Sequence, residues 1–517
     1  MRIIDFFDRG ADRYPDRDVV HDLARGWTYR EVQTLTRRIA TALIAVGLRQ
    51  DSTVATYTPN SALGFAAQYG VLRAGAVWLP INVRNGVDEN IAVLDRMEVE
   101  FLFFASQYEA DMAKIRAQLP KLRRLVCLDA ESIHGPSLTQ WLEGHGIDGV
   151  FFEKGPLDTV SMMTTSGTTG APKGVVLTNL SWEAMIASYH IAMPYDAPPM
   201  QIVAAPLTHA AGCLTASLLA FGGTSVLLPK PEPLAILEAI DRFKATTLFM
   251  PPTLIYMLLS HPKVRDFDYA HLKYFVYGAA PMAVQKLREA TEIFGPVMCQ
   301  TYGQSEALMS VTFMSAAEHM EALADPALEK RLWSAGRSGP LAVVGIMDDH
   351  GTLLPPGERG EIVCRGNILM AGYHKNPAAT AEVGAYGWHH TGDIGVLDAD
   401  GYLYIVDRKK DLIITGGFNV YPGEVEQVIW THPSVQDCAV VGIPDDKWGE
   451  AVTAVVELKP GAAFDPDEII ALCKEKLGSV KAPKSVVVID SLPRSAVGKV
   501  LKREIRDRFW QGRQRAI

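Results

Sequence analysis

The sequence predicts an α/β protein, with a large N-terminal domain of layered βαβ subdomains plus a small β unit, and a small α+β C-terminal domain. Up to about Trp333, short apolar runs alternate with stretches of helical periodicity, as in parallel strands joined by helices. Beyond Trp333, short strands are separated by turns rich in glycine, proline and aspartate. A charged cluster, Asp407 to Asp411, then precedes a compact last unit. We therefore expect two domains, residues 1–407 and 408–517.

The first half of the chain contains the clearest helix start. Thr28 and Glu31 have the spacing of a capping box, and the apolar residues that follow at helical spacing end at Gly47. A capped helix is therefore predicted between these signals. Further elements expected in this half are strands 54–57, 76–81, 101–105 and 125–129 and a helix 62–73.

The second half repeats the alternation and then changes. The large domain should continue with helices 236–243, 253–259 and 282–294 and strands 246–250 and 274–277. The small β unit should contain strands 343–347, 361–365 and 402–406. The last unit should contain helices 423–431 and 466–477 and strands 438–442, 453–458 and 485–489.

Composition excludes several classes of protein. A net charge of −9 over 517 residues argues against general nucleic-acid binding. Six scattered cysteines without a CxxC pair predict free thiols in a reducing compartment, and the N-terminus lacks the apolar core of a signal peptide, so we expect a cytoplasmic protein. Residues 202–228 carry no formal charge and are long enough to span a bilayer. Pro206, His209 and the pair Gly222-Gly223 interrupt them, however, which favours a buried helix–strand unit over a transmembrane segment.

The stretch from Thr164 to Gly174, TTSGTTGAPKG, lies between two apolar segments predicted to be strands. Its eleven residues include three glycines, five hydroxyl side chains and a lysine. Glycines let backbone N–H groups approach an oligoanion, hydroxyls donate to phosphoryl oxygens, and Lys173 adds positive charge. Because Lys173 is flanked by Pro172 and Gly174, this is not a Walker A loop. The alternative interpretation is a flexible surface hairpin.

This loop resembles the phosphate-binding loop of the adenylate-forming (AMP-binding) superfamily, which includes acyl- and aryl-CoA synthetases, peptide-synthetase adenylation domains and firefly-type luciferases. Other motifs recur in the family's order over nearly the whole chain. The resemblance implies ATP, Mg²⁺ and coenzyme A as cofactors. It implies nucleotide binding by Thr165, Ser166, Gly167, Thr168, Thr169, Gly170, Lys173, Gly278, Ala279 and Ala280. Lys173 would also act on the reacting phosphates.

The pentapeptide Tyr302 to Glu306 resembles the family's second nucleotide motif. Tyr302 would pack on adenine beside Gly303, the Ser305 hydroxyl would meet the α-phosphate, and Glu306 would hold Mg²⁺ and serve catalysis. The family more commonly has threonine in place of Ser305; serine keeps the hydroxyl but loses the stiff β-branch.

The resemblance assigns ribose binding to two residues farther along the chain. Asp393, in the tripeptide Thr391-Gly392-Asp393, would accept hydrogen bonds from the ribose diol, because an ionised carboxylate is purely an acceptor. Arg408 would add a second ribose contact.

Residues of the last unit resemble the family's mobile parts. Lys499 would neutralise charge as the adenylate forms, and Lys410 would be the hinge on which the C-terminal domain turns. Gly416, Gly417 and Phe418 would line the tunnel for the pantetheine arm of coenzyme A. The alternatives are a solvated lysine in a basic tail that continues with Lys502, Arg503, Arg506, Arg508, Arg513 and Arg515, and an ordinary β-turn at the two glycines.

An acyl pocket is expected beside His209, to which we assign a positioning role without proton transfer. Tyr277, Gly278 and Leu308 would line it. The three stretches that form this pocket in the family carry no formal charge here, and they supply Leu207, Cys213, Leu214, Leu218, Val276, Tyr277, Ala279, Ala280, Leu308 and Met309. A second carboxylate on the substrate would need an arginine or lysine partner once it is desolvated in the pocket. We therefore expect the substrate to be an apolar acid.

We interpret the chain as an acid–CoA ligase that uses ATP to form an acyl-adenylate and then a thioester. Its partners would be a small carboxylic acid, ATP and CoA, with no nucleic acid and no transmembrane segment; a homodimer is left open. The alternatives are an adenylating enzyme that loads a carrier-protein phosphopantetheine, a luciferase-like oxygenase, and a nucleotide-binding protein without catalysis. Acid-dependent pyrophosphate release would separate the enzymes from the last of these.

Overall fold

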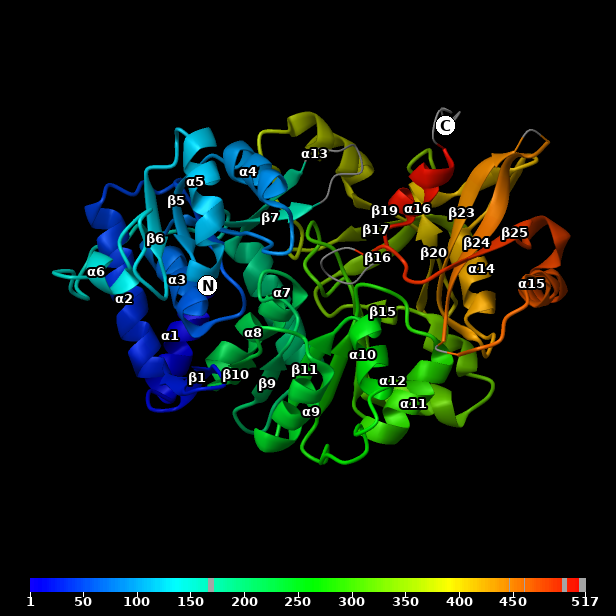
Figure 1. Ribbon diagram of the computed structural model, residues 1–517, viewed down its shortest axis with the longest axis horizontal. Helices are drawn as coiled ribbons and strands as arrows, with labels where there is room; N and C mark the ends of the chain where they lie inside the picture. Colours follow the sequence, from blue (N-terminus) through cyan, green and yellow to red (C-terminus); the bar gives the residue numbers. More distant parts are fainter. Residues whose placement is uncertain (166–171, 446, 460, 495–499, 511–517) are drawn as a thin grey trace.

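The computed structural model describes residues 1–165, 172–445, 447–459, 461–494 and 500–510. Two large sheets dominate the N-terminal part, and the smaller C-terminal part lies beside them (Figure 1). The fold class is therefore confirmed: α/β, with a layered large unit, a small β unit and an α+β C-terminal unit.

The first sheet has nine strands in the order β15-β14-β13-β12-β11-β9-β10-β1-β2. Its six central strands, from β13 to β1, are parallel, and antiparallel strands flank them at both edges. The strands are β1 (Asp18–His21), β2 (Gly26–Thr28), β9 (Met200–Val203), β10 (Thr224–Leu227), β11 (Thr247–Met250), β12 (Tyr274–Tyr277), β13 (Met298–Tyr302), β14 (Thr312–Met314) and β15 (Arg337–Ser338).

The second sheet has seven strands in the order β18-β8-β7-β4-β3-β5-β6. Strands β3 to β7 run parallel, whereas β8 turns back on β7 and β18 pairs antiparallel with β8. The strands are β3 (Thr53–Tyr57), β4 (Val77–Pro80), β5 (Val99–Phe104), β6 (Arg124–Cys127), β7 (Thr159–Thr165), β8 (Lys173–Thr178) and β18 (Gly372–Tyr373).

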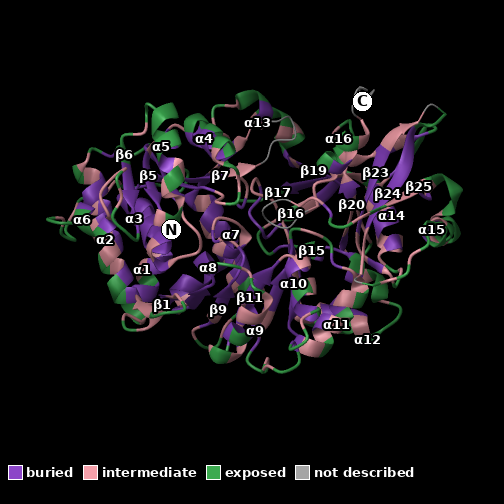
Figure 2. Cartoon of the chain, viewed as in Figure 1, coloured by how far each residue is buried: buried purple, intermediate pink, exposed green. Residues whose placement is uncertain are grey.

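Helices cover these sheets, with buried faces toward the strands and exposed faces outward (Figure 2). They are α1 (Ile3–Arg13), α2 (Tyr29–Ala45), α3 (Ala62–Ala74), α4 (Val87–Arg96), α5 (Glu109–Gln118), α6 (Leu138–Trp141), α7 (Asn179–Ala192), α8 (Ala210–Leu218), α9 (Pro233–Arg242), α10 (Pro252–Leu259), α11 (Val284–Phe294) and α12 (Ala316–Ala324). The predicted capping box of α2 is confirmed: the Thr28 side chain accepts from the Glu31 N–H, and Glu31 accepts from the Thr28 N–H.

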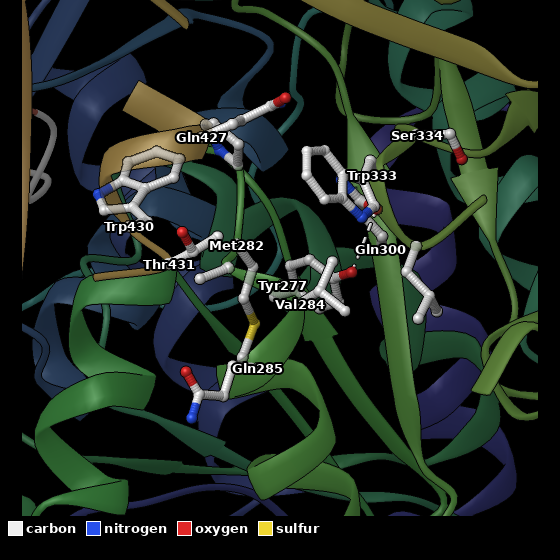
Figure 3. A pocket seen from close by; sticks show the side chains of 13 residues that line it. Tyr277, Met282, Val284, Gln285, Gln300, Trp333, Ser334, Gln427, Trp430 and Thr431 are labelled. Atoms are coloured by element: carbon white, nitrogen blue, oxygen red, sulfur yellow. Dashed lines mark hydrogen bonds between the residues drawn. The ribbon is translucent and has the colours of Figure 1, made fainter. Parts of the chain in front are cut away.

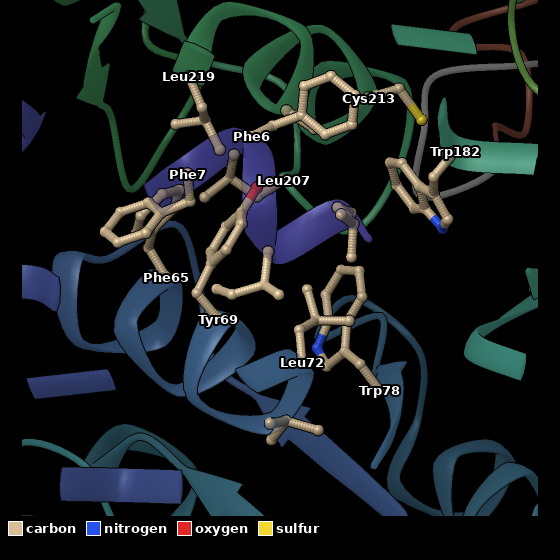
Figure 4. Packing of buried hydrophobic residues seen from close by; sticks show 14 of the residues in the cluster. Phe6, Phe7, Phe65, Tyr69, Leu72, Trp78, Trp182, Leu207, Cys213 and Leu219 are labelled. Carbon is tan, nitrogen blue, oxygen red and sulfur yellow. The ribbon is translucent and has the colours of Figure 1, made fainter. Parts of the chain in front are cut away.

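The largest apolar cluster joins α1, α2, α3, α7 and α8 to both sheets (Figure 4). Within it, the Tyr69 ring packs 5.4 Å from Phe7 and 4.5 Å from Phe65, measured between centroids. The uncharged segment 202–228 contributes β9, α8 and β10 to this interior, as predicted. In the part of the chain that the structure describes, no helix is long and apolar enough to cross a membrane.

The small β unit is an antiparallel sheet in the order β16-β17-β19-β20. Its strands are β16 (Val343–Met347), β17 (Arg359–Arg365), β19 (His389–Leu397) and β20 (Leu403–Arg408), and α13 (Pro377–Val383) precedes β19. The C-terminal unit contains β21 (Ile413–Thr415), β22 (Phe418–Val420), β23 (Val435–Asp445), β24 (Gly449–Leu458) and β25 (Ser485–Ile489), with α14 (Pro422–Ile429), α15 (Pro466–Lys481) and α16 (Lys502–Phe509). The strand β24 pairs antiparallel with β23 and parallel with β25.

One expectation needs correction. The helix predicted from residue 282 begins at Val284, because Ala279 takes a positive φ of 68° and the Ala283 N–H donates to the Tyr256 hydroxyl before the helix starts. Lys502, named in the alternative interpretation as part of a basic tail, lies on α16; its side chain is 20% exposed, and its Nζ lies 2.8 Å from Glu426 Oε1.

Candidate active site

Asp393, on β19, is the meeting point of three side chains. The Tyr302 hydroxyl donates to Asp393 Oδ2 over 2.6 Å, and the Gln304 amide donates to the same oxygen over 3.0 Å. Arg408 Nε lies 2.6 Å from Asp393 Oδ1. Because Asp393 is only 4% exposed, these groups rather than water stabilise its charge. The structure therefore brings together the predicted nucleotide residues Tyr302, Asp393 and Arg408.

A second group forms around Glu306, in the loop after β13. Glu306 Oε1 accepts a hydrogen bond from the Tyr373 hydroxyl over 2.9 Å, and the Glu306 carbonyl accepts from the Met370 N–H over 2.8 Å. Lys173 Nζ lies 4.7 Å from the centre of the Tyr373 ring, a cation–π distance. Burial and the charge of Glu306 raise the pKa of Tyr373, so its hydroxyl stays a donor. Tyr373 thus joins the predicted Mg²⁺ ligand to the predicted phosphate-binding lysine.

The two groups lie where the three sheets of the large unit meet. Tyr302 ends β13 of the nine-stranded sheet, Asp393 and Arg408 belong to the four-stranded sheet, and Lys173 begins β8 of the seven-stranded sheet. The charge of Glu306 also acts on Arg408. Burial alone would lower the pKa of Arg408, but neighbouring acids, Asp393 first, raise it above its ordinary value. The site therefore combines side chains from three different sheets with Glu306 of the loop after β13.

The loop that carries Glu306 needs glycine at its start. A Cβ atom added to Gly303 would lie 2.5 Å from the backbone of Met309, which itself has a positive φ of 42°. Ser305 lies between Gln304 and Glu306 in this tight loop. Through this turn the chain places Tyr302 against Asp393 and Glu306 against Tyr373.

Part of the predicted phosphate loop lies outside the described residues. The structure shows its flanks, where Thr165 of β7 pairs with Lys173 of β8. Ser166, Gly167, Thr168, Thr169 and Gly170 lie outside the described residues, and so does Lys499.

His209 occupies the N-cap position of α8, and within the described residues its side chain makes no capping hydrogen bond. Its Nδ1 lies 2.8 Å from the Thr208 hydroxyl. Burial, followed by the charge of Arg84, lowers the pKa of His209 to about 4, so the imidazole is neutral at pH 7. Leu308 belongs to the apolar cluster that covers this region, together with Leu207, Cys213, Leu214, Leu218, Val276 and Met309.

Tyr277 lies apart from this group. It packs in a different apolar cluster, and its hydroxyl contacts Gln300 Oε1 at 3.1 Å and His319 Nε2 at 2.9 Å. The neighbouring Val276 faces the His209 side, because successive strand residues point to opposite faces of a sheet. Tyr277 instead lines a cavity of about 140 Å³ between the two units, with Trp333 and Trp430 on opposite sides (Figure 3).

The turn after β12 has the geometry of a close backbone approach. A Cβ atom on Gly278 would lie 2.6 Å from the Thr301 carbonyl oxygen. Ala279 adopts a left-handed conformation, which is unusual for a residue other than glycine, and it is exposed. Gly278, Ala279 and Ala280 therefore present backbone at the carboxyl end of β12, where α/β sheets bind ligands.

The predicted tunnel residues form the tip of a hairpin on the C-terminal unit. Gly416 and Gly417 both have positive φ and connect β21 to β22 in a two-residue turn. Phe418 is 59% exposed, and a Cβ atom on Gly416 would lie 2.7 Å from the ring of Trp448. The structure thus does not bring this turn together with Asp393 and Glu306. Lys410, in contrast, lies within the electrostatic reach of Arg408, Asp393 and Lys173.

Two features of the site were not found from the sequence. Tyr373 was not predicted, although it contacts both Glu306 and Lys173, because the two-residue strand Gly372–Tyr373 has no recognisable motif. Gln304 was noted only as part of its motif, yet it donates to Asp393. In the described part of the chain, no group of three or more metal-ligating side chains is present, so Glu306 would need phosphate oxygens and water to complete a Mg²⁺ shell.

The comparisons with known proteins agree with this geometry. Residues 7–374 match the family model described as AMP-binding enzyme, and residues 424–499 match that of its C-terminal domain. The chain belongs to the AMP-binding enzyme family. A feruloyl-CoA synthase from an Amycolatopsis species is 35% identical over 507 residues, covering 97% of this chain and 98% of that protein. The medium/long-chain-fatty-acid–CoA ligase FadD8 of Mycobacterium tuberculosis is 42% identical over 369 residues, covering 70% of this chain and 63% of that protein.

The arrangement of the two units has a counterpart among solved structures. The structure of ATP-bound MatB from Rhodopseudomonas palustris is 29% identical in sequence to this chain and superposes on it with a TM-score of 0.88. The match covers 98% of this chain and 99% of that chain. The apo form of MatB, at 30% identity and with coverage of 98% and 99%, gives a TM-score of 0.78. The present conformation thus resembles the nucleotide-bound form more closely than the apo form.

Proposed function

We propose that this protein is an ATP-dependent acid–CoA ligase that forms an acyl-adenylate and then an acyl-CoA thioester from an apolar carboxylic acid. The observation that carries the proposal is the group of side chains around Asp393. A buried carboxylate held by Tyr302, Gln304 and Arg408 is suited to a ribose diol, because it accepts two hydrogen bonds in a fixed orientation. The 35% identical feruloyl-CoA synthase, matched over nearly its whole length, supports thioester formation.

In this proposal, the triphosphate lies between Lys173 and the segment 165–170. The Tyr373 ring holds the Lys173 side chain by a cation–π contact. The ammonium can therefore contact phosphoryl oxygens with a smaller loss of side-chain entropy. Mg²⁺ fits beside Glu306, since Oε1 is used by Tyr373 and Oε2 can take a cation. The ion would neutralise charge on the phosphates. Lys499 would add positive charge at the α-phosphate while the carboxylate attacks.

The acid would bind beside His209. A neutral imidazole next to apolar Leu207 and Leu308 can position a substrate but does not add a full charge to the pocket. Gly278, Ala279 and Ala280 would form the wall between this pocket and the nucleotide, with backbone groups that accept close approach. The fatty-acid and feruloyl specificities named for the two relatives support an apolar acyl group.

The two domains of the proposal meet at the charged cluster. β20 pairs with β19 through Arg408, so this pairing ends one residue past the boundary proposed between residues 1–407 and 408–517. Lys410 follows in a single 3-10 turn, Lys409–Asp411, and would be the hinge. All six cysteines are free and buried, which supports a reducing, cytoplasmic environment.

The test is a panel of carboxylic acids incubated with ATP and Mg²⁺, with and without CoA, while pyrophosphate, AMP and thioester are quantified. We expect acid-dependent pyrophosphate release, followed by AMP and thioester only when CoA is added. A holo acyl-carrier protein replaces CoA in a parallel reaction. Efficient transfer to the carrier but not to CoA would favour the carrier-loading alternative. Absence of acid-dependent pyrophosphate across the panel would refute the proposal.

A further inference from the structure

A buried carboxylate at the end of the large unit holds the C-terminal unit. Asp407 lies in β20, and its backbone pairs with Ile394 of β19, so it belongs to the four-stranded sheet. Its Oδ2 accepts a hydrogen bond from the Gly423 N–H over 2.7 Å, and its Oδ1 lies 3.8 Å from Lys502 Nζ. Both partners belong to the C-terminal unit, on α14 and α16. The side chain of Asp407 is 4% exposed.

The contact with α14 requires close approach of two backbones. A Cβ atom added to Gly423 would lie 2.4 Å from the Val406 carbonyl oxygen, a distance that real side chains do not adopt. Gly423 lies in the first turn of α14, where the helix dipole and free N–H groups favour a negative charge. The carboxylate of Asp407 therefore satisfies the start of this helix only when α14 rests directly on β20.

Lys502 has a second partner that does not depend on the large unit. Glu426 Oε1 lies 2.8 Å from Lys502 Nζ, and the same carboxylate accepts from the Val440 N–H over 2.7 Å. Burial alone would lower the pKa of Lys502, but Glu426 and Asp407 raise it above its ordinary value. If the units separated, Lys502 would keep Glu426, whereas Asp407 would lose both contacts. Of Asp407, Glu426 and Lys502, Asp407 is therefore the residue whose two contacts both depend on the arrangement of the two units.

The arrangement seen here presents one side of the C-terminal unit to the large unit. Arg494 Nη1 lies 3.5 Å from the Thr253 hydroxyl of α10, and Arg494 forms a β-bridge with Val500. These two residues flank the segment that contains Lys499. The hairpin tip Gly416–Phe418 is exposed instead. Arg494, which precedes that segment, therefore contacts the large unit, whereas the predicted tunnel residues are exposed.

We propose that Asp407 is a positioning residue that holds the C-terminal unit in the adenylation arrangement, and that it releases Gly423 and Lys502 when the unit turns for thioester transfer. This inference rests on the proposed function. The chain between the two parts is short, because β20 ends at Arg408 and β21 begins at Ile413. A contact one residue before this connection acts close to the axis of rotation and must break when the dihedral angles there change.

The test separates the two half-reactions. Asp407→Ala should lower kcat for acid-dependent pyrophosphate release about tenfold, while conversion of supplied acyl-adenylate and CoA to thioester stays within twofold of wild type. Asp407→Glu should restore part of the first rate, because it keeps the charge. Gly423→Ala should act in the same direction as Asp407→Ala, since its methyl group would push α14 away from Val406.

Two control variants distinguish positioning from general damage. Glu426→Gln removes a contact within the C-terminal unit, so it should lower the melting temperature and affect both half-reactions alike. Glu468→Gln, an exposed partner of His432 in the same unit, should change neither rate. A role of Asp407 through its neighbour Arg408 would slow both half-reactions, because both bind the same ribose. Equal losses in the two half-reactions, or no loss in either, would overturn the proposal.

Hydrogen–deuterium exchange tests the docked arrangement without turnover. In Asp407→Ala, exchange should rise several-fold in peptides covering 420–426 and 500–506 and stay unchanged in the core strand β24. Unchanged exchange at α14 would overturn the contact itself. A wild-type enzyme that releases no pyrophosphate with any acid would instead refute the proposed function, and with it the step assigned to Asp407, even if the exchange result held.

Discussion

At the scale of single residues, we expect the buried carboxylate of Asp393 to contribute most to ligand binding at the site. Asp393 Oδ2 accepts hydrogen bonds from Tyr302 and Gln304, and Oδ1 contacts Arg408, so the orientation of the carboxylate is set before a ligand arrives. Ionised acceptors form hydrogen bonds roughly twice as strong as neutral ones, and they are costly to leave unpaired. Removing one donor should therefore weaken ligand binding without unfolding the protein.

Tyr302→Phe tests this expectation, because it removes only the hydroxyl that donates to Asp393. Loss of a hydrogen bond to a charged group is worth about 1.5 kcal/mol, so the KM for ATP should rise about tenfold. The kcat should change less than threefold, since the ring that would pack on adenine is kept. Initial rates of pyrophosphate release over a range of ATP concentrations give both constants. A fall in kcat at unchanged KM would show that Tyr302 acts on the reacting groups.

The sequence predicted those residues that stand in motifs and missed those that reach the site through folding. Tyr302, Asp393 and Arg408 lie in recognisable stretches, and the structure brings them together. Tyr373 reaches Glu306 only because β18 joins the edge of the seven-stranded sheet, a long-range pairing without a local signal. Tyr277 was placed on the wrong side of β12, since strand alternation depends on a register that apolar composition does not reveal.

At the scale of secondary structure, prediction succeeded for elements with strong local signals. The capping box of α2 and the strand β12 were found, because hydroxyl–carboxylate spacing and β-branched or aromatic runs act locally. The hairpin β23–β24 is longer than predicted, at Val435–Asp445 and Gly449–Leu458. Its polar ends extend the ladder through backbone pairing, which side-chain pattern does not show. The domain boundary, the hinge and the site roles remain predictions.

The helix α12 supplies an acid-sensitive element. His319 is 1% exposed; its Nδ1 lies 2.8 Å from the Ser315 carbonyl oxygen, and its Nε2 faces the Tyr277 hydroxyl. Burial lowers the pKa of His319 to about 4. Its neutral form is therefore the folded form, and the unfolded chain takes up a proton first as pH falls. This lowers the free energy of unfolding progressively between about pH 6.5 and pH 4, by up to about 3 kcal/mol.

His319→Gln should remove part of this pH dependence, because glutamine does not titrate. Urea denaturation at pH 7.5, 6.0 and 5.0 should show the variant less stable than wild type at pH 7.5 and losing less stability toward pH 5. His350→Gln, in an exposed turn, is the matched control and should follow the wild-type profile. Parallel pH profiles of His319→Gln and wild type would contradict the assignment.

At the scale of the whole molecule, the connection between the two units should control the second half-reaction. Lys410 lies within the 3-10 turn Lys409–Asp411, and such turns have φ near the value that proline imposes. Lys410→Pro should therefore keep the present arrangement, in which Arg494 contacts the large unit, and resist rotation away from it. Adenylation should stay within threefold of wild type, and thioester formation from supplied acyl-adenylate should fall at least tenfold. Lys410→Ala, which stays flexible, serves as control. Equal losses in both steps would remove Lys410 as the hinge.

The whole pocket decides which acid is used, and its apolar lining argues for a substrate with a sizeable hydrocarbon part. Leu207, Leu214 and Leu308 belong to one buried cluster, and each buried methylene contributes about 0.8 kcal/mol, or about fourfold in kcat/KM. Arg84 acts on His209, a cation that the sequence did not place there, but it is exposed and would stabilise a second carboxylate only weakly. We therefore expect kcat/KM to rise from acetate through medium-chain acids until the pocket is filled, with malonate near the bottom. The series from acetate to palmitate, with benzoate, cinnamate and malonate, measures this directly. A preference for acetate or malonate would contradict the apolar pocket and make Arg84 the residue to substitute next.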